Sequence, residues 1–210
     1  MFLRYAILIY LLCKSNFAFS EYIMIGDSIF VHRGEEIKRT LEISQKIKIR
    51  NHAKTGAWMH EVVSQYSKAQ KSSGDIIIMD GGGNNILGDS GNCRGNPNDA
   101  CKSHLKKISL EFKTLLETME KDGISVVFYL GPYYGSGWSG GNFETAVDMG
   151  SDLMRGACEN TMIDCSFIDP RKVMAGNTRE WDGVHPNAEG VKILSDIIAR
   201  SMRRTTRSRF

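Results

Sequence analysis

The chain has 210 residues, of which 41% are hydrophobic and 24% are charged, and its formal net charge at pH 7 is +3. This composition excludes a disordered chain, a collagen-like repeat and a coiled-coil rod, and the length favours a single domain. No apolar run reaches the roughly 18 to 20 residues that span a bilayer, and the weak net charge gives no reason to expect a nucleic-acid partner.

The first 20 residues have the pattern of a secretory signal peptide that is cleaved after Ser20. Arg4 supplies a positive charge, residues 5–13 form a short apolar segment, and Ala18 and Ser20 place small side chains at the cleavage positions. The apolar segment is too short to be a stable membrane anchor. We therefore expect a secreted or periplasmic protein, the alternative being that this segment is a buried N-terminal helix.

After this leader, five short apolar runs alternate with stretches of helical periodicity. Strands are expected at 22–25, 47–50, 75–79, 125–130 and 162–168, and helices at 35–44, 58–71, 101–121, 143–158 and 188–202. The run Ile76-Ile77-Ile78-Met79 is typical of a parallel strand that is covered on both faces. The alternation predicts one α/β domain over residues 21–202, in which a parallel sheet lies between two layers of helices.

Three segments fall outside these predicted elements. Residues 81–100 and 131–142 are expected to be long loops that follow the third and fourth strands, at the edge where open α/β sheets bind ligands. Residues 203–210 contain four arginines and are expected to form a disordered basic tail.

Four cysteines remain after the leader, namely Cys93, Cys101, Cys158 and Cys165. An even number of cysteines in an exported chain indicates two disulfides, for which three connectivities are possible. The close spacings make Cys93–Cys101 and Cys158–Cys165 the simplest pairing. These cysteines form no CxxC pair and lie far from the histidines in sequence, so no metal site is expected.

Segments with candidate catalytic residues follow several of the predicted strands. Gly26-Asp27-Ser28 ends the first strand, where a serine can present its hydroxyl beside free backbone N–H groups. Asp182 and His185 stand three positions apart, so one turn could supply a general base and the carboxylate that orients it. Gly56 and Asn84 could each donate a hydrogen bond to an oxyanion. Taken singly, each segment is also compatible with an ordinary turn.

Together, these segments resemble the motifs of the SGNH hydrolase superfamily, the GDSL-like esterases and lipases. The resemblance extends over residues 26–186, and its key residues occur in the family's order: Ser28, Gly56, Asn84 and His185. One departure is Asn85, which stands where an aspartate is frequent. The resemblance implies a flavodoxin-like three-layer α/β/α sandwich with a five-stranded parallel sheet in the order 2-1-3-4-5.

The same resemblance implies a role for each of these residues. Ser28 would be the nucleophile, His185 the general base and acid, and Asp182 the residue that orients His185. The oxyanion hole would consist of the backbone N–H groups of Ser28 and Gly56 and the side-chain amide of Asn84. The implied reaction is ester hydrolysis through an acyl-enzyme, which requires no cofactor.

Aromatic residues near these motifs give a clue to the substrate, because aromatic faces beside a polar site suit sugar rings or a flat acyl group. The candidate substrate-binding residues are Trp58, Tyr133, Tyr134, Trp138 and Trp181. Each of them is equally compatible with a packing role. We expect a monomeric esterase that removes short acyl groups, such as acetyl, from a small ester or an acylated carbohydrate or cell-envelope glycan. The alternatives are a lysophospholipase or thioesterase for longer acyl chains, and a non-catalytic glycan-binding domain.

Overall fold

A computed structural model describes residues 20–136, 141–179 and 182–208 of the chain. Except for Ser20, the predicted leader lies outside these residues. Within the described part, no helix combines the length and the apolar character that a membrane crossing requires.

Five parallel strands form one sheet in the order β2-β1-β3-β4-β5, as the sequence resemblance implied. The strands are β1 (Tyr22–Ile25), β2 (Ile49–Asn51), β3 (Ile76–Met79), β4 (Val126–Leu130) and β5 (Asp164–Ile168). In the centre of the sheet, Ile77 pairs with Ile23 on one side and with Val127 on the other. All three side chains are buried, which agrees with a strand that is covered on both faces.

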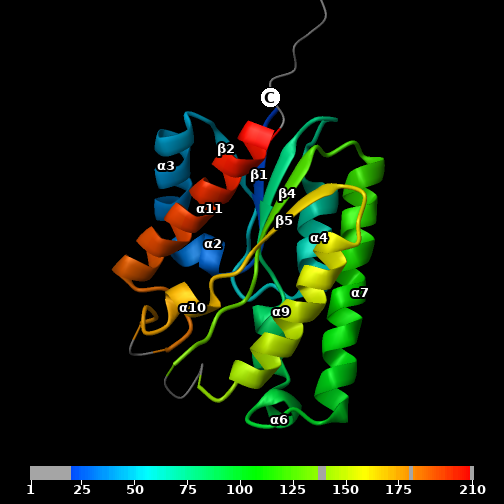
Figure 1. Ribbon diagram of the computed structural model, residues 1–210, viewed down its shortest axis with the longest axis vertical. Helices are drawn as coiled ribbons and strands as arrows, with labels where there is room; N and C mark the ends of the chain where they lie inside the picture. Colours follow the sequence, from blue (N-terminus) through cyan, green and yellow to red (C-terminus); the bar gives the residue numbers. More distant parts are fainter. Residues whose placement is uncertain (1–19, 137–140, 180–181, 209–210) are drawn as a thin grey trace, which may run out of the picture.

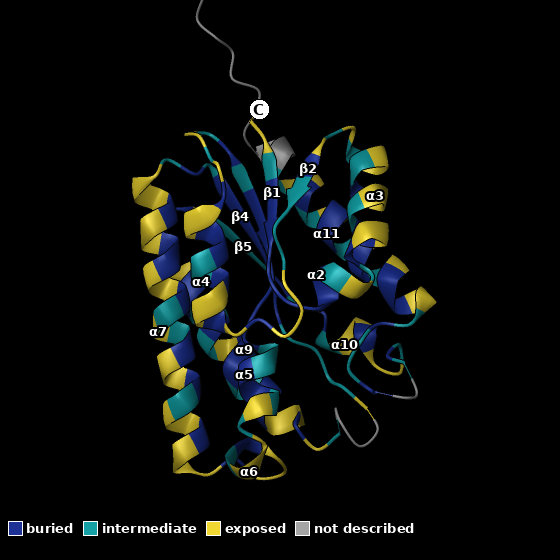
Figure 2. Cartoon of the chain, turned by 180° about the vertical axis from the view of Figure 1, so that it is seen from behind, coloured by how far each residue is buried: buried dark blue, intermediate teal, exposed yellow. Residues whose placement is uncertain are grey.

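Helices cover both faces of the sheet (Figures 1 and 2). One face packs against α4 (Met59–Lys68), α5 (Gly83–Gly88), α7 (Asp99–Lys121) and α9 (Glu144–Glu159). The other face packs against α2 (Ile29–His32), α3 (Gly34–Gln45), α10 (Arg171–Met174) and α11 (Ala188–Ser208). Side chains alternate along the strands between these two cores, so that Ile77 belongs to the first and Ile78 to the second.

The structure corrects three expectations about the elements. Residues 81–100 are not a plain loop, because they contain α5 and α6 (Ser90–Cys93), which are too short to show helical periodicity in the sequence. The second strand begins at Ile49 rather than at residue 47, because Lys46 adopts a left-handed conformation that ends α3. The expected disordered tail is wrong for residues 203–208, which continue α11. Arginine has a high helix propensity and interacts favourably with a helix C-terminus.

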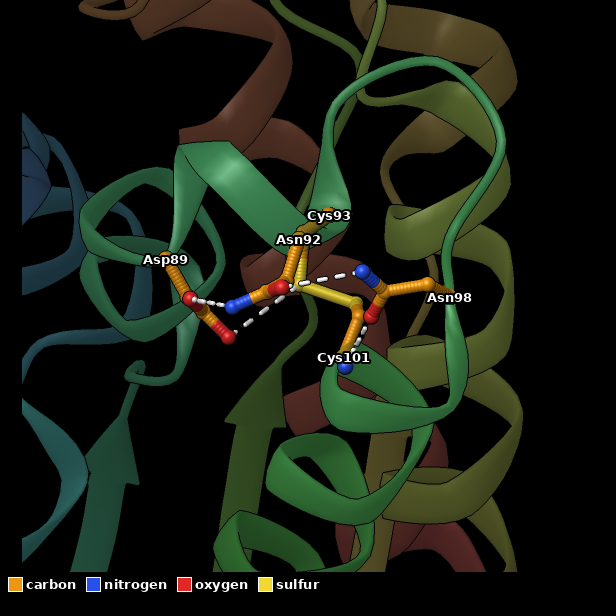
Figure 3. Close-up of a disulfide and its surroundings, with 5 residues drawn as sticks. All are labelled: Asp89, Asn92, Cys93, Asn98 and Cys101. Carbon is orange, nitrogen blue, oxygen red and sulfur yellow. Dashed lines mark hydrogen bonds between the residues drawn. A yellow bond between two sulfur atoms is a disulfide. The ribbon is translucent and has the colours of Figure 1, made fainter.

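Both predicted disulfides, Cys93–Cys101 and Cys158–Cys165, are present. The first joins α6 to the first turn of α7 (Figure 3). Beside it, Asn98 caps α7 by accepting a hydrogen bond of 3.0 Å from the Cys101 N–H. The Asn98 amide also donates to the Asn92 side chain at 2.9 Å. The segment that follows α5 is therefore cross-linked both covalently and by hydrogen bonds.

Candidate active site

The turn that carries Ser28 follows β1 and is held by side chains from other elements. The side chain of Gln65, on α4, accepts from the Gly26 N–H at 2.7 Å and donates to the Gly26 carbonyl oxygen at 2.8 Å. Gly26 has a φ of +147°, and a Cβ at this position would lie 1.7 Å from Oδ1 of Asp80. Glycine is therefore required where the strand passes into the turn.

Ser28 lies at the start of α2 and is only 6% exposed. Within the described residues, neither its N–H nor its hydroxyl group forms a hydrogen bond. The preceding residue, Asp27, stabilises the turn, since its Oδ1 accepts from the Ile29 N–H at 3.0 Å. The serine is thus fixed by its neighbours while its own polar groups stay available.

Asn84, in the first turn of α5, lies beside this serine turn, as the sequence led us to expect. Its side-chain amide donates to Oδ2 of Asp27 at 3.1 Å and to the carbonyl oxygen of Ala57 at 3.2 Å. The next residue, Asn85, is buried, and its Oδ1 accepts from the Met59 N–H at 2.9 Å. An asparagine supplies the acceptor oxygen here that an aspartate would supply.

Asp182 and His185 interact directly. Oδ2 of Asp182 lies 2.8 Å from Nδ1 of His185, and its Oδ1 accepts from the N–H groups of Val184 and His185 at 2.8 and 2.9 Å. Burial raises the pKa of Asp182, but these hydrogen bonds outweigh it and hold the pKa below the ordinary value. The His185 ring also contacts the ring of His32, with centroids 5.0 Å apart. Because His32 lies on α2, His185 is held against the helix that starts at Ser28.

A pocket with a volume of about 70 Å³ opens beside Ser28 and Asn84 at the carboxyl edge of the sheet, and the described residues that line it include Val184 but neither Asp182 nor His185. Ser28, Asn84 and Asp80 contribute polar groups to it. Most of the remaining lining is apolar and includes Ile29, Ile86, Leu87, Leu130, Phe143, Val147 and Val184. The pocket is therefore a small apolar chamber with a serine and an amide at its wall.

The predicted aromatic residues lie in different places. Tyr133 lines the pocket, and its hydroxyl donates to the Val184 carbonyl oxygen at 2.7 Å. Burial raises the pKa of Tyr133 well above its usual range. Tyr134 instead donates to Asp148 at 2.7 Å and is not among the described residues that line the pocket. Trp138 and Trp181 lie outside the described residues.

Gly56 and Trp58 occupy a turn at the surface beside α5. Gly56 is exposed with a φ of +73°, and its N–H donates to no acceptor in the described part of the chain. Trp58 is 36% exposed and packs against Gly88, where an added Cβ would come within 2.5 Å of the indole ring. Among the described residues, those that line the pocket include neither Gly56 nor Trp58. Both are near α5 rather than inside the chamber.

Solved structures share this fold over most of their length. A candidate SGNH hydrolase from Slackia heliotrinireducens is 16% identical, with a TM-score of 0.64 over 87% of this chain and 98% of that one. LAE5, an alpha/beta hydrolase enzyme from the metagenome of Lake Arreo, Spain, is 17% identical, with a TM-score of 0.65 over 88% and 95%. An acetylxylan esterase from Geobacillus stearothermophilus is 16% identical, with a TM-score of 0.64 over 88% and 94%. The chain has the SGNH hydrolase fold.

At identities of 16 to 17% the likeness shows the fold alone. No protein-family model matches the chain, and none of the curated proteins matches it in sequence. In the described part of the chain, no group of three or more His, Cys, Asp or Glu side chains could hold a metal ion.

The structure adds three residues to this candidate site that the sequence interpretation missed. Gln65 lies within the predicted helix 58–71, three positions after Val62 and one before Tyr66, so a polar residue in an apolar stripe was the available signal. Asp80 directly follows the apolar run of β3, and His32 follows the serine motif by four positions. Neither Asp80 nor His32 has a sequence signal that predicts its contact with the site.

Proposed function

We propose that this protein is a carboxylic ester hydrolase of the SGNH type, with Ser28 as nucleophile, His185 as general base and Asp182 as the orienting carboxylate. The observation that supports this best is the Asp182–His185 hydrogen bond of 2.8 Å, with His185 packed on the helix that begins at Ser28. Three solved structures of the Geobacillus esterase are catalytic mutants, in which a serine, an aspartate or a histidine is replaced by alanine. That aspartate and that histidine are three positions apart, as are Asp182 and His185.

In the proposed reaction, His185 accepts the hydroxyl proton of Ser28 as Oγ attacks the ester carbonyl carbon. The tetrahedral intermediate collapses, the alcohol leaves with the proton from His185, and the acyl group remains on Ser28. His185 then takes a proton from water, whose oxygen attacks the acyl-enzyme and releases the acid. Asp182 stays ionised and stabilises the imidazolium in both steps, in agreement with its lowered pKa.

The oxyanion of each intermediate would be bound by the N–H groups of Ser28 and Gly56 and by the amide of Asn84. The two backbone groups have no competing acceptor in the described residues. The Asn84 amide is already engaged by Asp27 and Ala57, so the oxyanion must share one of its hydrogens with these acceptors. Donors that are fixed in place before the reaction stabilise developing charge most effectively.

The size of the pocket supports a short acyl group. A cavity needs about 10 to 15 Å³ to hold one water-sized group, so 70 Å³ has room for only a few non-hydrogen atoms. An acetyl group fits, whereas a long acyl chain would need a longer apolar trough. We therefore propose acetyl esters as substrates and keep lysophospholipids and thioesters as the alternative.

A carbohydrate is the proposed alcohol component of the ester. The Geobacillus protein is an acetylxylan esterase, and one solved variant replaces the tryptophan that directly precedes its mutated aspartate. Trp181 precedes Asp182 in the same way. We propose that Trp181, with Trp58 and Trp138, binds the sugar rings, because aromatic faces suit such rings. The two disulfides agree with the proposed export of the protein.

The deciding experiment measures hydrolysis of acetylated xylo-oligosaccharides, p-nitrophenyl esters of increasing chain length and lysophospholipids. We expect the fastest turnover on acetyl esters, with none in Ser28→Ala. Ser67→Ala, which changes an exposed serine on α4, is the matched control and should retain full activity. An optimum at long chains would favour the lipid alternative.

Covalent labelling separates the enzyme from a glycan-binding domain without catalysis. We expect a fluorophosphonate probe to label the wild type and Ser67→Ala but not Ser28→Ala. A folded wild-type protein that stays unlabelled and inactive on every ester would contradict the proposed function.

A further inference from the structure

Two carboxyl groups are buried side by side behind the serine turn. Asp27 is 5% exposed and Asp80 is 4% exposed. In the described part of the chain, no lysine or arginine side chain forms an ion pair with either of them. Two adjacent carboxylates without a cation are strongly unfavourable in a buried environment, so the pair must hold a proton.

The contacts indicate which of the two holds that proton. Burial raises the pKa of Asp27 as well, but Asp27 is the better stabilised as a carboxylate, because it accepts from the Ile29 N–H at 3.0 Å and from the Asn84 amide at 3.1 Å. Oδ1 of Asp80 accepts from the Asp27 N–H at 2.7 Å, whereas its Oδ2 is buried without a partner among the described residues. Burial, followed by the charge of Asp27, raises the pKa of Asp80 well above its ordinary value. Asp80 is therefore the neutral member of the pair.

We propose that Asp80 is a positioning residue for the proposed ester hydrolysis, acting as a neutral carboxylic acid that holds the serine turn and keeps a single negative charge behind the oxyanion donors. Its Oδ1 fixes the N–H of Asp27, the residue before Ser28. The Asn84 amide donates to Asp27. Because Asp80 is uncharged, Asp27 carries the single negative charge behind that amide.

A second charge at Asp80 would oppose the reaction for an electrostatic reason. The oxyanion develops beside Asn84, and a nearby anion in a site that excludes water raises the energy of that intermediate. The other titratable groups near the pair do not offset this charge when the pH rises. Tyr129 and Tyr133 stay neutral, since burial raises the pKa of both, and a charge on His185 favours the ionised form of Asp27, whose pKa it lowers.

The test compares Asp80→Asn with Asp80→Ala over a range of pH. Asparagine keeps the acceptor oxygen and cannot ionise, so we expect Asp80→Asn to retain most of the kcat at neutral pH. Asp80→Ala leaves the Asp27 N–H without its acceptor, and we expect its kcat to fall by about 10- to 100-fold at nearly unchanged KM. At alkaline pH the wild-type kcat/KM should decline before that of Asp80→Asn, which is a shift that a purely structural role would not cause.

Asp75→Asn is the matched control, because Asp75 is a buried aspartate at the opposite end of the same strand. Its alkaline profile should follow the wild type. If Asp80→Asn follows the wild type at every pH, or loses as much kcat as Asp80→Ala, the inference is wrong. If Asp80→Ala does not fold, the Asp80→Asn profile still decides. Hydrolysis by Ser28→Ala would instead refute the proposed function, so the two failures are distinguishable.

Discussion

The two halves of the candidate site are held in different ways. The Ser28 turn is fixed by residues far away in sequence, because Gln65, Asp80 and Asn84 lie 39, 53 and 57 positions from their partners in the turn. The half that contains His185 is held mainly by local bonds, in which Asp182 accepts from residues two and three positions later.

This difference has consequences for stability and for turnover. The bonds of the serine half are buried between strands and helices, so breaking them disturbs the cooperative core. The Asp182–His185 half lies on a connection after α10, and its contacts with the body include those of Tyr133 with Val184, Ser136 with Gly183 and His185 with His32. We expect changes in the serine half to affect folding as well as turnover, and changes in the histidine half to affect mainly turnover.

The largest expected effect is on turnover, in Asp182→Asn. The asparagine can keep the acceptor for the Val184 N–H, but its amide would face Nδ1 of His185 and favour the wrong tautomer. We expect kcat to fall by about 10⁴-fold, with a nearly unchanged free energy of unfolding. Asp196→Asn, an exposed change on α11, is the control. If the free energy of unfolding fell by as much as the activation free energy of turnover rose, the two halves would not differ in the proposed way.

Asn84→Ala tests a residue that has two proposed roles, since it donates to the oxyanion and also stabilises the serine turn. Loss of one oxyanion donor should raise the barrier by about 2.7 to 4 kcal/mol, which single-turnover kinetics would measure. The lost bonds to Asp27 and Ala57 should cost about 1 kcal/mol in unfolding by urea. Asn160→Ala removes an amide hydrogen bond at the exposed end of α9 and should leave turnover unchanged. Unchanged turnover in Asn84→Ala would remove Asn84 from the mechanism.

Gly26→Ala is the corresponding test of folding in the serine half. The new Cβ would collide with Asp80, and the φ of +147° would strain any other residue. We expect the free energy of unfolding to fall by about 2 to 3 kcal/mol. Gly156→Ala is the control, since its Cβ would meet nothing within 4 Å on a helix. If Gly26→Ala and Gly156→Ala changed the free energy of unfolding equally, the serine turn would be less rigid than its contacts indicate.

The sequence predicted the central sheet well because its strands are buried on both faces and form continuous apolar runs, as in Ile76–Met79. It did not predict α2, α5, α6 or α10. These helices have four, six, four and four residues, too few for a helical period to appear. The sequence did not predict the helix at 203–208, because a run of like charges is typical of disordered ends, although arginines are also compatible with a helix end.

In the candidate site, too, the sequence predicts the local motifs but not the contacts between distant segments. Ser28, Asn84, Asp182 and His185 stand in recognisable local motifs, and the sequence predicted all of them as a set. The pairing of Asp27 with Asp80 spans 53 positions and depends on β1 and β3 being neighbours in the sheet. No local pattern encodes such a contact, and the same is true of the size of the pocket.

A smaller effect is expected at the contact between the two halves. Tyr133→Phe removes the hydroxyl that donates to Val184, which should cost about 1 kcal/mol in unfolding and lower kcat modestly as the histidine half loosens. Tyr134→Phe is a close control, because it loses a bond of the same length to Asp148 outside the pocket. Equal effects of the two changes on kcat would mean that Tyr133 does not support the position of His185.

The smallest effects are expected in the pH dependence of stability, where the two halves should differ in sign. The pKa of Asp182 is lowered from 3.8, so the stability that it contributes is present above that value and is lost as the pH falls through the folded-state pKa. The pKa of Asp80 is raised, so its contribution is present below 3.8 and is lost as the pH rises toward its folded-state pKa. Urea unfolding over a pH series should therefore show Asp80→Asn gaining stability over the wild type as the pH rises. Asp182→Asn should be only slightly less stable than the wild type at neutral pH, and this small difference should vanish as the pH falls. Slopes of the same sign would mean that the two carboxyls do not differ in the way their contacts predict.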